Sequence, residues 1–185
     1  MPIVTLILVA LQKFWTGSFS MQFFTWANFT TVLFEYDVTA RAIKNMGIHN
    51  LILVAPSDFP HEKAFFRAKS ASDILENAII FETLEEAVKD SNYVIGTSAR
   101  NRKVPWPLVT PKQCSNELVS FIKQQDSKIS VVFGREDRGL TNNELLLANK
   151  TFNIPTSQNN PSLNLSHAVS IVLYELNKSS KKNFN

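Results

Sequence analysis

The sequence predicts a single α/β domain built on a parallel sheet with helices on both faces. Short apolar runs that end at turn residues alternate with segments of helical periodicity along most of the chain. A strand at residues 31–35, a helix at 38–45 that ends at Gly47, and a strand at 50–54 form the clearest unit. A strand–helix–strand unit of this kind places its two strands parallel in one sheet. The length of 185 residues suffices for one substantial core.

Further elements continue the same alternation. Thr141 with Glu144, and Thr83 with Glu86, have the spacing of capping boxes at helix starts. The remaining strands are expected at residues 79–81, 93–96, 131–133 and 151–154, and the remaining helices at 60–77 in two pieces, 111–125 and 163–176.

Composition excludes several classes of protein. Hydrophobic residues make up 44% of the chain and charged residues 19%, which is typical of a globular rather than a disordered protein. A net charge of +3 permits an RNA partner but does not demand one. Cys114 is the only cysteine, and the three histidines are scattered. We therefore expect no intrachain disulfide, no metal site and a reduced, cytoplasmic setting.

The first 28 residues have a character of their own. Residues 3–11 are an apolar run about half as long as the ~20 residues of a membrane-spanning helix. The run lacks a positively charged start and a small-residue cleavage site, and aromatic residues crowd the stretch after it. We expect an atypical apolar segment packed on the domain, rather than a membrane anchor. The domain itself is expected at residues 29–177, with a polar tail at 178–185.

The densest group of chemical signals lies in residues 131–176. A buried strand is expected to end at Gly134, and Gly134 and Gly139 frame four consecutive charged residues. Glycine lets a ligand approach the main chain, since it has no β-carbon. A polar loop follows the strand at 151–154, and such loops beyond strand ends are where open α/β sheets bind ligands.

Several blocks resemble a known family. GREDRGLTNNEL (134–145), IPT (154–156) and SLNLSHAVSIVLYEL (162–176) resemble the last two motifs of the SpoU–TrmH family of RNA ribose 2′-O-methyltransferases, of the SPOUT superfamily. TARAIKNMGIHNLILVAP (39–56) resembles the first motif. The GTSAR.R form (96–102) is similar to the TrmJ-like branch, which acts on cytidine or uridine in the tRNA anticodon loop.

The resemblance implies a fold and an activity. The fold is an α/β-knot, in which the C-terminal segment threads through a loop to form a trefoil knot. The activity is methyl transfer from S-adenosylmethionine to a ribose 2′-OH of RNA, with tRNA as the expected substrate. The resemblance also implies a homodimer and requires no metal.

The resemblance assigns the cofactor pocket to three loop ends. Arg100 and Arg102 follow one of these ends and add positive charge suited to RNA phosphates. The expected cofactor-binding residues are Thr97, Ser98, Ala99, Gly134, Ile154, Ser162 and Leu163.

Four residues are expected to carry the chemistry. Arg41 would contact the RNA phosphate and help to draw off the hydroxyl proton, although a guanidinium is a poor base because it stays protonated. Ser162 and Asn164 would orient the hydroxyl, and Glu136 would order the glycine turn. The residues alone leave other interpretations open. Arg41 can be an exposed helix cation, and Glu136 can be a surface carboxylate paired with a neighbouring arginine.

The chain departs from the family pattern before the first motif. Relatives carry an Asn-x-Gly loop ahead of the Ala-Arg-Ala sequence, whereas residues 36–39 form a shorter connection here. An alternative function is therefore a catalytically impaired protein that keeps the fold and binds RNA or cofactor. A nucleotide-binding dehydrogenase is excluded, because no G-x-G-x-x-G sequence follows a strand.

Overall fold

The computed structural model describes residues 3–9, 39–56, 59–99, 107–122, 128–157 and 162–181. The strands are β1 (Ile3–Val9), β2 (Asn50–Val54), β3 (Ile79–Phe81), β4 (Tyr93–Thr97), β5 (Leu108–Val109), β6 (Lys128–Phe133) and β7 (Lys150–Phe152). The helices are one over residues 39–45, α2 (Glu62–Ala68), the 3-10 turn η1 (Lys69–Ala71), α3 (Ser72–Glu76), α4 (Leu84–Val88), α5 (Pro111–Ile122), α6 (Asn142–Leu145) and α7 (Leu165–Lys181).

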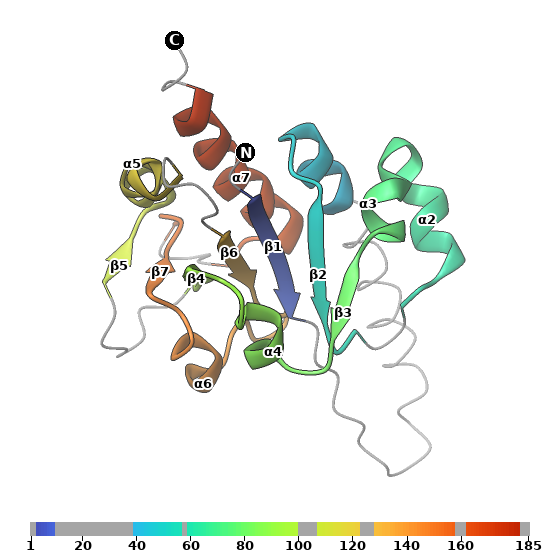
Figure 1. The fold of residues 1–185 in the computed structure, drawn as a ribbon, viewed down its shortest axis with the longest axis horizontal. Helices are drawn as coiled ribbons and strands as arrows, with labels where there is room; N and C mark the ends of the chain where they lie inside the picture. Colours follow the sequence, from blue (N-terminus) through green and yellow to red (C-terminus); the bar gives the residue numbers. More distant parts are fainter. Residues whose placement is uncertain are drawn as a thin grey trace.

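The described strands form one parallel sheet in the order β3-β2-β1-β6-β4-β7-β5 (Figure 1). Every pair of neighbouring strands in this sheet is parallel. The predicted α/β class with a parallel sheet is therefore confirmed. Because the strands are parallel, their carboxyl ends meet at one edge of the sheet, and the loops that leave them lie close together.

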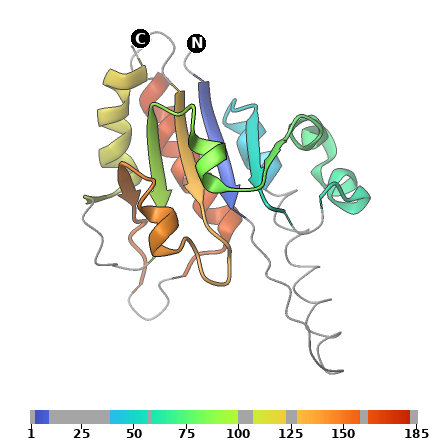
Figure 2. The ribbon, with the colours of Figure 1, turned by 60° about the horizontal axis from the view of Figure 1, so that its bottom comes forward.

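The sheet carries a hydrophobic core on each face. Along β2, Leu51 and Leu53 belong to one core, whereas Ile52 and Val54 belong to the other, as the alternation of side chains along a strand requires. The first core holds residues of the helix over 39–45, α3, α5 and α7, and the second holds residues of α4 and α6. Figure 2 shows α4 and α6 in front of the sheet and α7 behind it.

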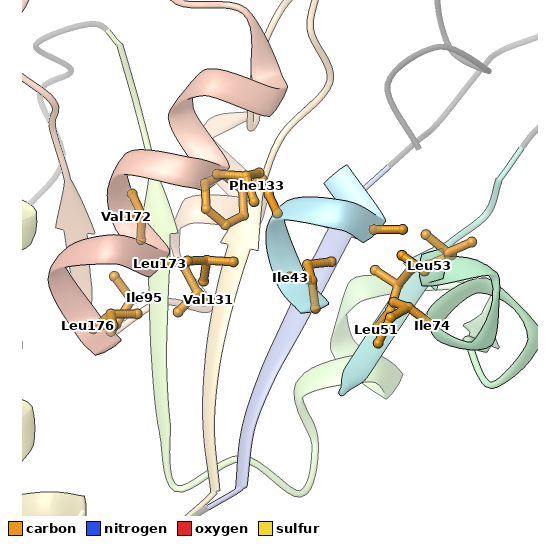
Figure 3. Packing of buried hydrophobic residues seen from close by; sticks show 14 of the residues in the cluster. Ile43, Leu51, Leu53, Ile74, Ile95, Val131, Phe133, Val172, Leu173 and Leu176 are labelled. Atoms are coloured by element: carbon orange, nitrogen blue, oxygen red, sulfur yellow. The ribbon is translucent and has the colours of Figure 1, made fainter. Parts of the chain in front are cut away.

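The first core fixes two helices that later bear on function. Ile43 of the helix over 39–45, Phe133 at the end of β6 and Leu173 of α7 are almost fully buried in it (Figure 3). Burial of each such side chain stabilises the fold by about 1.5–3 kcal/mol. Both helices are thereby held against the same face of the sheet. No helix in the described ranges has the length and apolar character needed to span a bilayer.

Strand β1 corrects one expectation from the sequence. Ile3–Val9 pairs with β2 on one side and β6 on the other, so this part of the atypical segment belongs to the sheet. The strand expected at residues 31–35 lies outside the described residues. Residues 36–38 lie outside them as well, so the inferred shortening of the connection at residues 36–39 stays a prediction.

Other local predictions hold. Strands β2 and β3 have the predicted bounds, and α7 starts two residues later than predicted and extends to Lys181. Gly47 ends its helix with a φ of 72°, while the Ile48 backbone N–H donates to the Ile43 carbonyl. Thr83 caps α4 by accepting a hydrogen bond from the Glu86 backbone N–H. Strand β5 was not predicted, because it has only two residues.

Candidate active site

A pocket lies where the carboxyl ends of β4, β6 and β7 meet the N-terminal end of α7. Thr97, Phe133 and Phe152, the last residues of these three strands, all line it. This is the edge of a parallel sheet at which ligands bind in α/β proteins. The position of the pocket therefore follows from the strand order.

The structure brings together the residues expected to bind a cofactor. They come from three separate loops and from the residues just before α7. Glu136, expected among the catalytic residues, lines the same pocket. The seven residues that share this lining are Thr97, Ser98, Ala99, Gly134, Ile154, Ser162 and Leu163.

Hydrogen bonds between strand ends fix one side of the pocket. Thr97 donates from Oγ1 to the Val132 carbonyl at 3.1 Å. The Ser98 backbone N–H donates to the Phe152 carbonyl at 2.9 Å, and Asn153 Nδ2 donates to the Ser98 carbonyl at 3.0 Å. Each of the three bonds ties β4 to a neighbouring strand or its loop. The backbone of residues 97–99 is therefore held in one arrangement beside the pocket.

The turn after β6 forms the opposite side, and its shape depends on Gly134. A β-carbon at Gly134 would lie 2.2 Å from both the Gly139 carbonyl carbon and the Leu140 backbone nitrogen. The space that glycine leaves is thus filled by the returning backbone of the same turn. The prediction that Gly134 admits a ligand to the main chain needs this correction. Gly139 has a φ of 69° and open space around it, so backbone conformation is the constraint there.

An ion pair closes the turn. Arg135 donates from Nη2 to Glu144 Oε1 at 2.8 Å and from Nη1 to Oε2 at 3.3 Å, and both side chains are largely buried. Glu144 Oε2 also accepts from the Thr141 backbone N–H at 2.7 Å, which completes the predicted capping box. Burial alone would raise the pKa of the Glu144 carboxyl, but the hydrogen bonds from Arg135 and Thr141 hold that pKa below its ordinary value.

Glu136, which lines the pocket, contacts Asn164, which lies outside its described lining. Asn164 donates from Nδ2 to Glu136 Oε1 at 3.1 Å. Arg135 pairs with Glu144, and Arg138 with Asp137 at 3.0 Å, so the ion pairs seen here are not those considered for Glu136 from the sequence. Two of the residues expected to carry chemistry are therefore in direct contact.

The remaining expected residues lie elsewhere. Arg41 is exposed on the helix over 39–45 and lies outside the described lining of the pocket. Arg100 and Arg102 lie outside the described residues. Their expected contacts with RNA stay predictions.

Sequence reasoning missed other parts of the site. Arg135 was considered only as a partner for Glu136, although its spacing from Glu144 lies within the motif GREDRGLTNNEL. The apolar lining also went unpredicted, because its members are scattered along the chain. These apolar residues are Phe133, Leu140, Phe152, Leu165 and Ala168.

The lining fits a ligand with an apolar body and charged groups of both signs, such as S-adenosylmethionine. Apolar side chains cover much of the surface, while Thr97, Ser98 and Ser162 offer hydroxyl groups. The pocket is also lined by charged residues of both signs, namely Arg135, Glu136, Asp137 and Arg138. Pockets of this kind combine an apolar lining with a few placed polar groups. The donor set therefore fits the expected cofactor.

The lone cysteine takes no part in this site. Cys114 is buried in α5, away from the described lining of the pocket. Burial raises the pKa of its thiol to about 11. The thiol therefore stays protonated at neutral pH and is a poor nucleophile.

The family model of the SpoU rRNA Methylase family matches residues 38–174 of the chain. The chain is 44% identical over 137 residues to the tRNA (cytidine/uridine/adenosine-2'-O-)-methyltransferase TrmJ of Pseudomonas aeruginosa (strain UCBPP-PA14), covering 74% of this chain and 53% of the relative. It is 43% identical over 138 residues to the tRNA (cytidine/uridine-2'-O-)-methyltransferase TrmJ of Photorhabdus laumondii, covering 75% and 56%. The chain spans about half the length of these curated relatives.

A solved structure agrees with these matches. The crystal structure of TrmJ from Z. mobilis ZM4 superposes with a TM-score of 0.76 at 30% identity. The superposition covers 97% of this chain and 70% of that one. It therefore extends to most of the chain, beyond the residues that the sequence matches cover.

The close approach of the backbone to Gly134 gives a test of the turn after β6. In Gly134→Ala, the new β-carbon would overlap the backbone of Gly139 and Leu140, so the turn must move. We expect the free energy of unfolding in urea to fall by about 3 kcal/mol. Gly139→Ala is the matched control, because it meets open space and costs only about 1–2 kcal/mol for its positive φ. Equal stability of the two variants would contradict the role given to Gly134.

The ion pair predicts a pH dependence. Because the pKa of Glu144 is lowered in the folded state, its charge stabilises the fold above the ordinary pKa of 4.5. That contribution is lost as the pH falls through the lowered value. Glu144→Gln should reduce the free energy of unfolding by about 2 kcal/mol at pH 7. The difference from wild type should shrink as the pH falls below 4.5, as urea unfolding across pH would show. A difference that stays constant would rule out this account.

Proposed function

The chain belongs to the SpoU rRNA methylase family, and on that premise we propose that it transfers a methyl group from S-adenosylmethionine to a ribose 2′-OH of tRNA. The observation that carries the proposal is the pocket. Residues from β4, β6, β7 and the start of α7, which lie far apart in the sequence, line one ligand-sized site. The relatives with 43–44% identity are named as tRNA 2′-O-methyltransferases, which supports the activity and the substrate.

Bound S-adenosylmethionine supplies an electrophilic methyl group. The apolar lining holds the adenine and the methionine chain, and the hydroxyl groups of Thr97, Ser98 and Ser162 bind polar atoms. The turn after β6, closed by Arg135 and Glu144, keeps its side of the pocket in place. The protein thus acts mainly by holding the two reactants in line. Such positioning can supply a large part of the reduction in the activation barrier.

The target hydroxyl must be aligned and must lose its proton. Ser162 and Asn164 orient the hydroxyl, and Asn164 donates a hydrogen bond to the carboxylate of Glu136. Arg41 binds the adjacent RNA phosphate, and its charge stabilises the oxygen as the proton passes to water, because the guanidinium itself stays protonated. Arg100 and Arg102 bind further phosphates of the RNA.

A homodimer is part of the proposal. Arg41 lies outside the described lining of the pocket in its own chain, so a second copy can bring its Arg41 to the bound RNA. Helix α7 is not wholly internal, because Ile171 and Tyr174 are 39% and 51% exposed on one face. These side chains supply an apolar surface for the second copy.

The detailed topology of the chain and its cellular location follow those of the family. The C-terminal segment, including α7, forms a trefoil knot. The protein acts in the cytoplasm, which its single cysteine supports.

The alternative of a catalytically impaired protein has no support. It rested on a shortened connection at residues 36–39, of which residues 36–38 lie outside the described residues. The matching relatives are named as methyltransferases.

Substitution of Arg41 tests the chemistry. Arg41→Ala should lower methyl transfer to unmodified tRNA transcripts on the order of 100-fold or more. Binding of S-adenosylmethionine, measured by calorimetry, should stay intact because Arg41 lies outside the described pocket lining. Arg41→Lys should rescue little, since a point charge lacks the bidentate fork. Turnover that survives Arg41→Ala would show that another residue carries this role, and wild-type binding without turnover on any tRNA would refute the activity.

Substitution on α7 tests the dimer. Ile171→Asp should shift the protein from dimer to monomer at micromolar concentration, because a carboxylate is costly to bury at an apolar interface. Sedimentation velocity would measure the shift. Phe66→Asp is the matched control, since Phe66 is 84% exposed on α2, an element outside the proposed interface. A monomeric wild-type protein would contradict the dimer.

A further inference from the structure

Ser166 is a buried hydroxyl beside the pocket with no role in the scheme above. It is the second residue of α7, and its neighbours Leu165 and Ala168 line the pocket. Its side chain is 7% exposed. Two other buried hydroxyls in the described part of the chain, those of Thr39 and Thr151, lack a hydrogen-bond partner. The hydroxyl of Ser166 has a hydrogen-bond partner, and that partner is a residue of the proposed active site.

The partner is the side chain of Asn164. Ser166 donates from Oγ to Asn164 Oδ1 at 2.5 Å, and its backbone N–H donates to the same oxygen at 2.9 Å. The backbone contact is the bond of an N-cap residue to the second residue of its helix. The hydroxyl contact is additional. A serine inside a helix more often donates to the carbonyl four residues earlier, as Ser170 does to Ser166 at 2.8 Å.

These two bonds determine which way the Asn164 amide points. An amide oxygen has two lone pairs, and Ser166 supplies a donor for each of them. The amide nitrogen, which can only donate, is then turned away from the helix. It donates to Glu136 Oε1 at 3.1 Å. The orientation of Asn164 toward the turn after β6 is thus fixed from the side of α7.

The connection links the turn after β6 to the start of α7. Glu136 is exposed, and so is Asn164, so neither is held in place by packing. Ser166 is buried and lies on a helix whose Val169 and Val172 are fully buried in the core. The packed core therefore holds Ser166 in place. Ser166 in turn holds Asn164, and Asn164 holds Glu136.

We propose that Ser166 is a positioning residue, which directs the amide of Asn164 toward Glu136 and thereby holds both groups for the methyl transfer. The inference rests on the proposed function, because that function gives Asn164 and Glu136 their roles in methyl transfer. Ser166 itself acts only through Asn164.

The side-chain amide signals of Asn164 in a nitrogen-15 NMR spectrum test the orientation without any turnover. Loss of one pair of signals in Asn164→Ala identifies them. In Ser166→Ala, these signals should move toward the shifts of a solvent-exposed asparagine, because only the backbone N–H of residue 166 then holds the amide oxygen. Ser170→Ala is the matched control, since it removes a hydroxyl bonded to a backbone carbonyl of the same helix. Signals that stay in place in Ser166→Ala would overturn the proposal.

Kinetics with tRNA transcripts test the consequence. Ser166→Ala should lower kcat about tenfold with little change in KM for tRNA, as expected for misplaced groups. Ser166→Thr keeps the hydroxyl and should restore most of the rate, whereas Ser170→Ala should match wild type. A wild-type kcat in Ser166→Ala would overturn the positioning role. Wild-type protein that transfers no methyl group would instead refute the proposed function, while the amide signals would still decide the orientation of Asn164.

Discussion

The close passage of two backbone segments after β6 is the constraint on which the site depends. Gly134 lies so near to Gly139 and Leu140 that no side chain fits between them. The turn must therefore close tightly, and it carries four consecutive charged residues. Arg135 relieves part of this concentration of charge by pairing with Glu144, which leaves Glu136 free to face α7. Sterics and electrostatics thus act together to shape one wall of the pocket.

Much of the fold could be predicted from the sequence, because local patterns carried the information. Asn50–Val54 and Ile79–Phe81 are short apolar runs bounded by turn residues, and Thr141 with Glu144 is a local capping signal. Strand β1 was not recognised, since an apolar run near the start of a chain has several possible roles. Only its pairing with β2 and β6 distinguishes a central strand from an appended segment. Such pairing joins distant residues and leaves no local signal.

The candidate site divides in the same way. The pocket residues Thr97, Gly134 and Ser162 could be named because they stand in recognisable blocks. The reason why glycine is needed at Gly134 could not be predicted, because the backbone that occupies the space of a side chain there comes from the other side of the turn. The partner of Arg135 was equally hidden, since a run of alternating charges does not show which pairs form. Sequence therefore located the site better than it explained the contacts within it.

The interior position of β1 has a consequence for synthesis. Val4 pairs with Ile129, and Leu8 pairs with both Leu53 and Phe133. The ribosome makes β1 long before β6, so this apolar strand lacks its β6 partner while most of the chain is produced. Its edge toward β6 is unpaired during that time and can join other chains. Pairing between such distant segments also slows folding. The same arrangement that places β1 in the interior of the finished sheet therefore exposes the growing chain to aggregation.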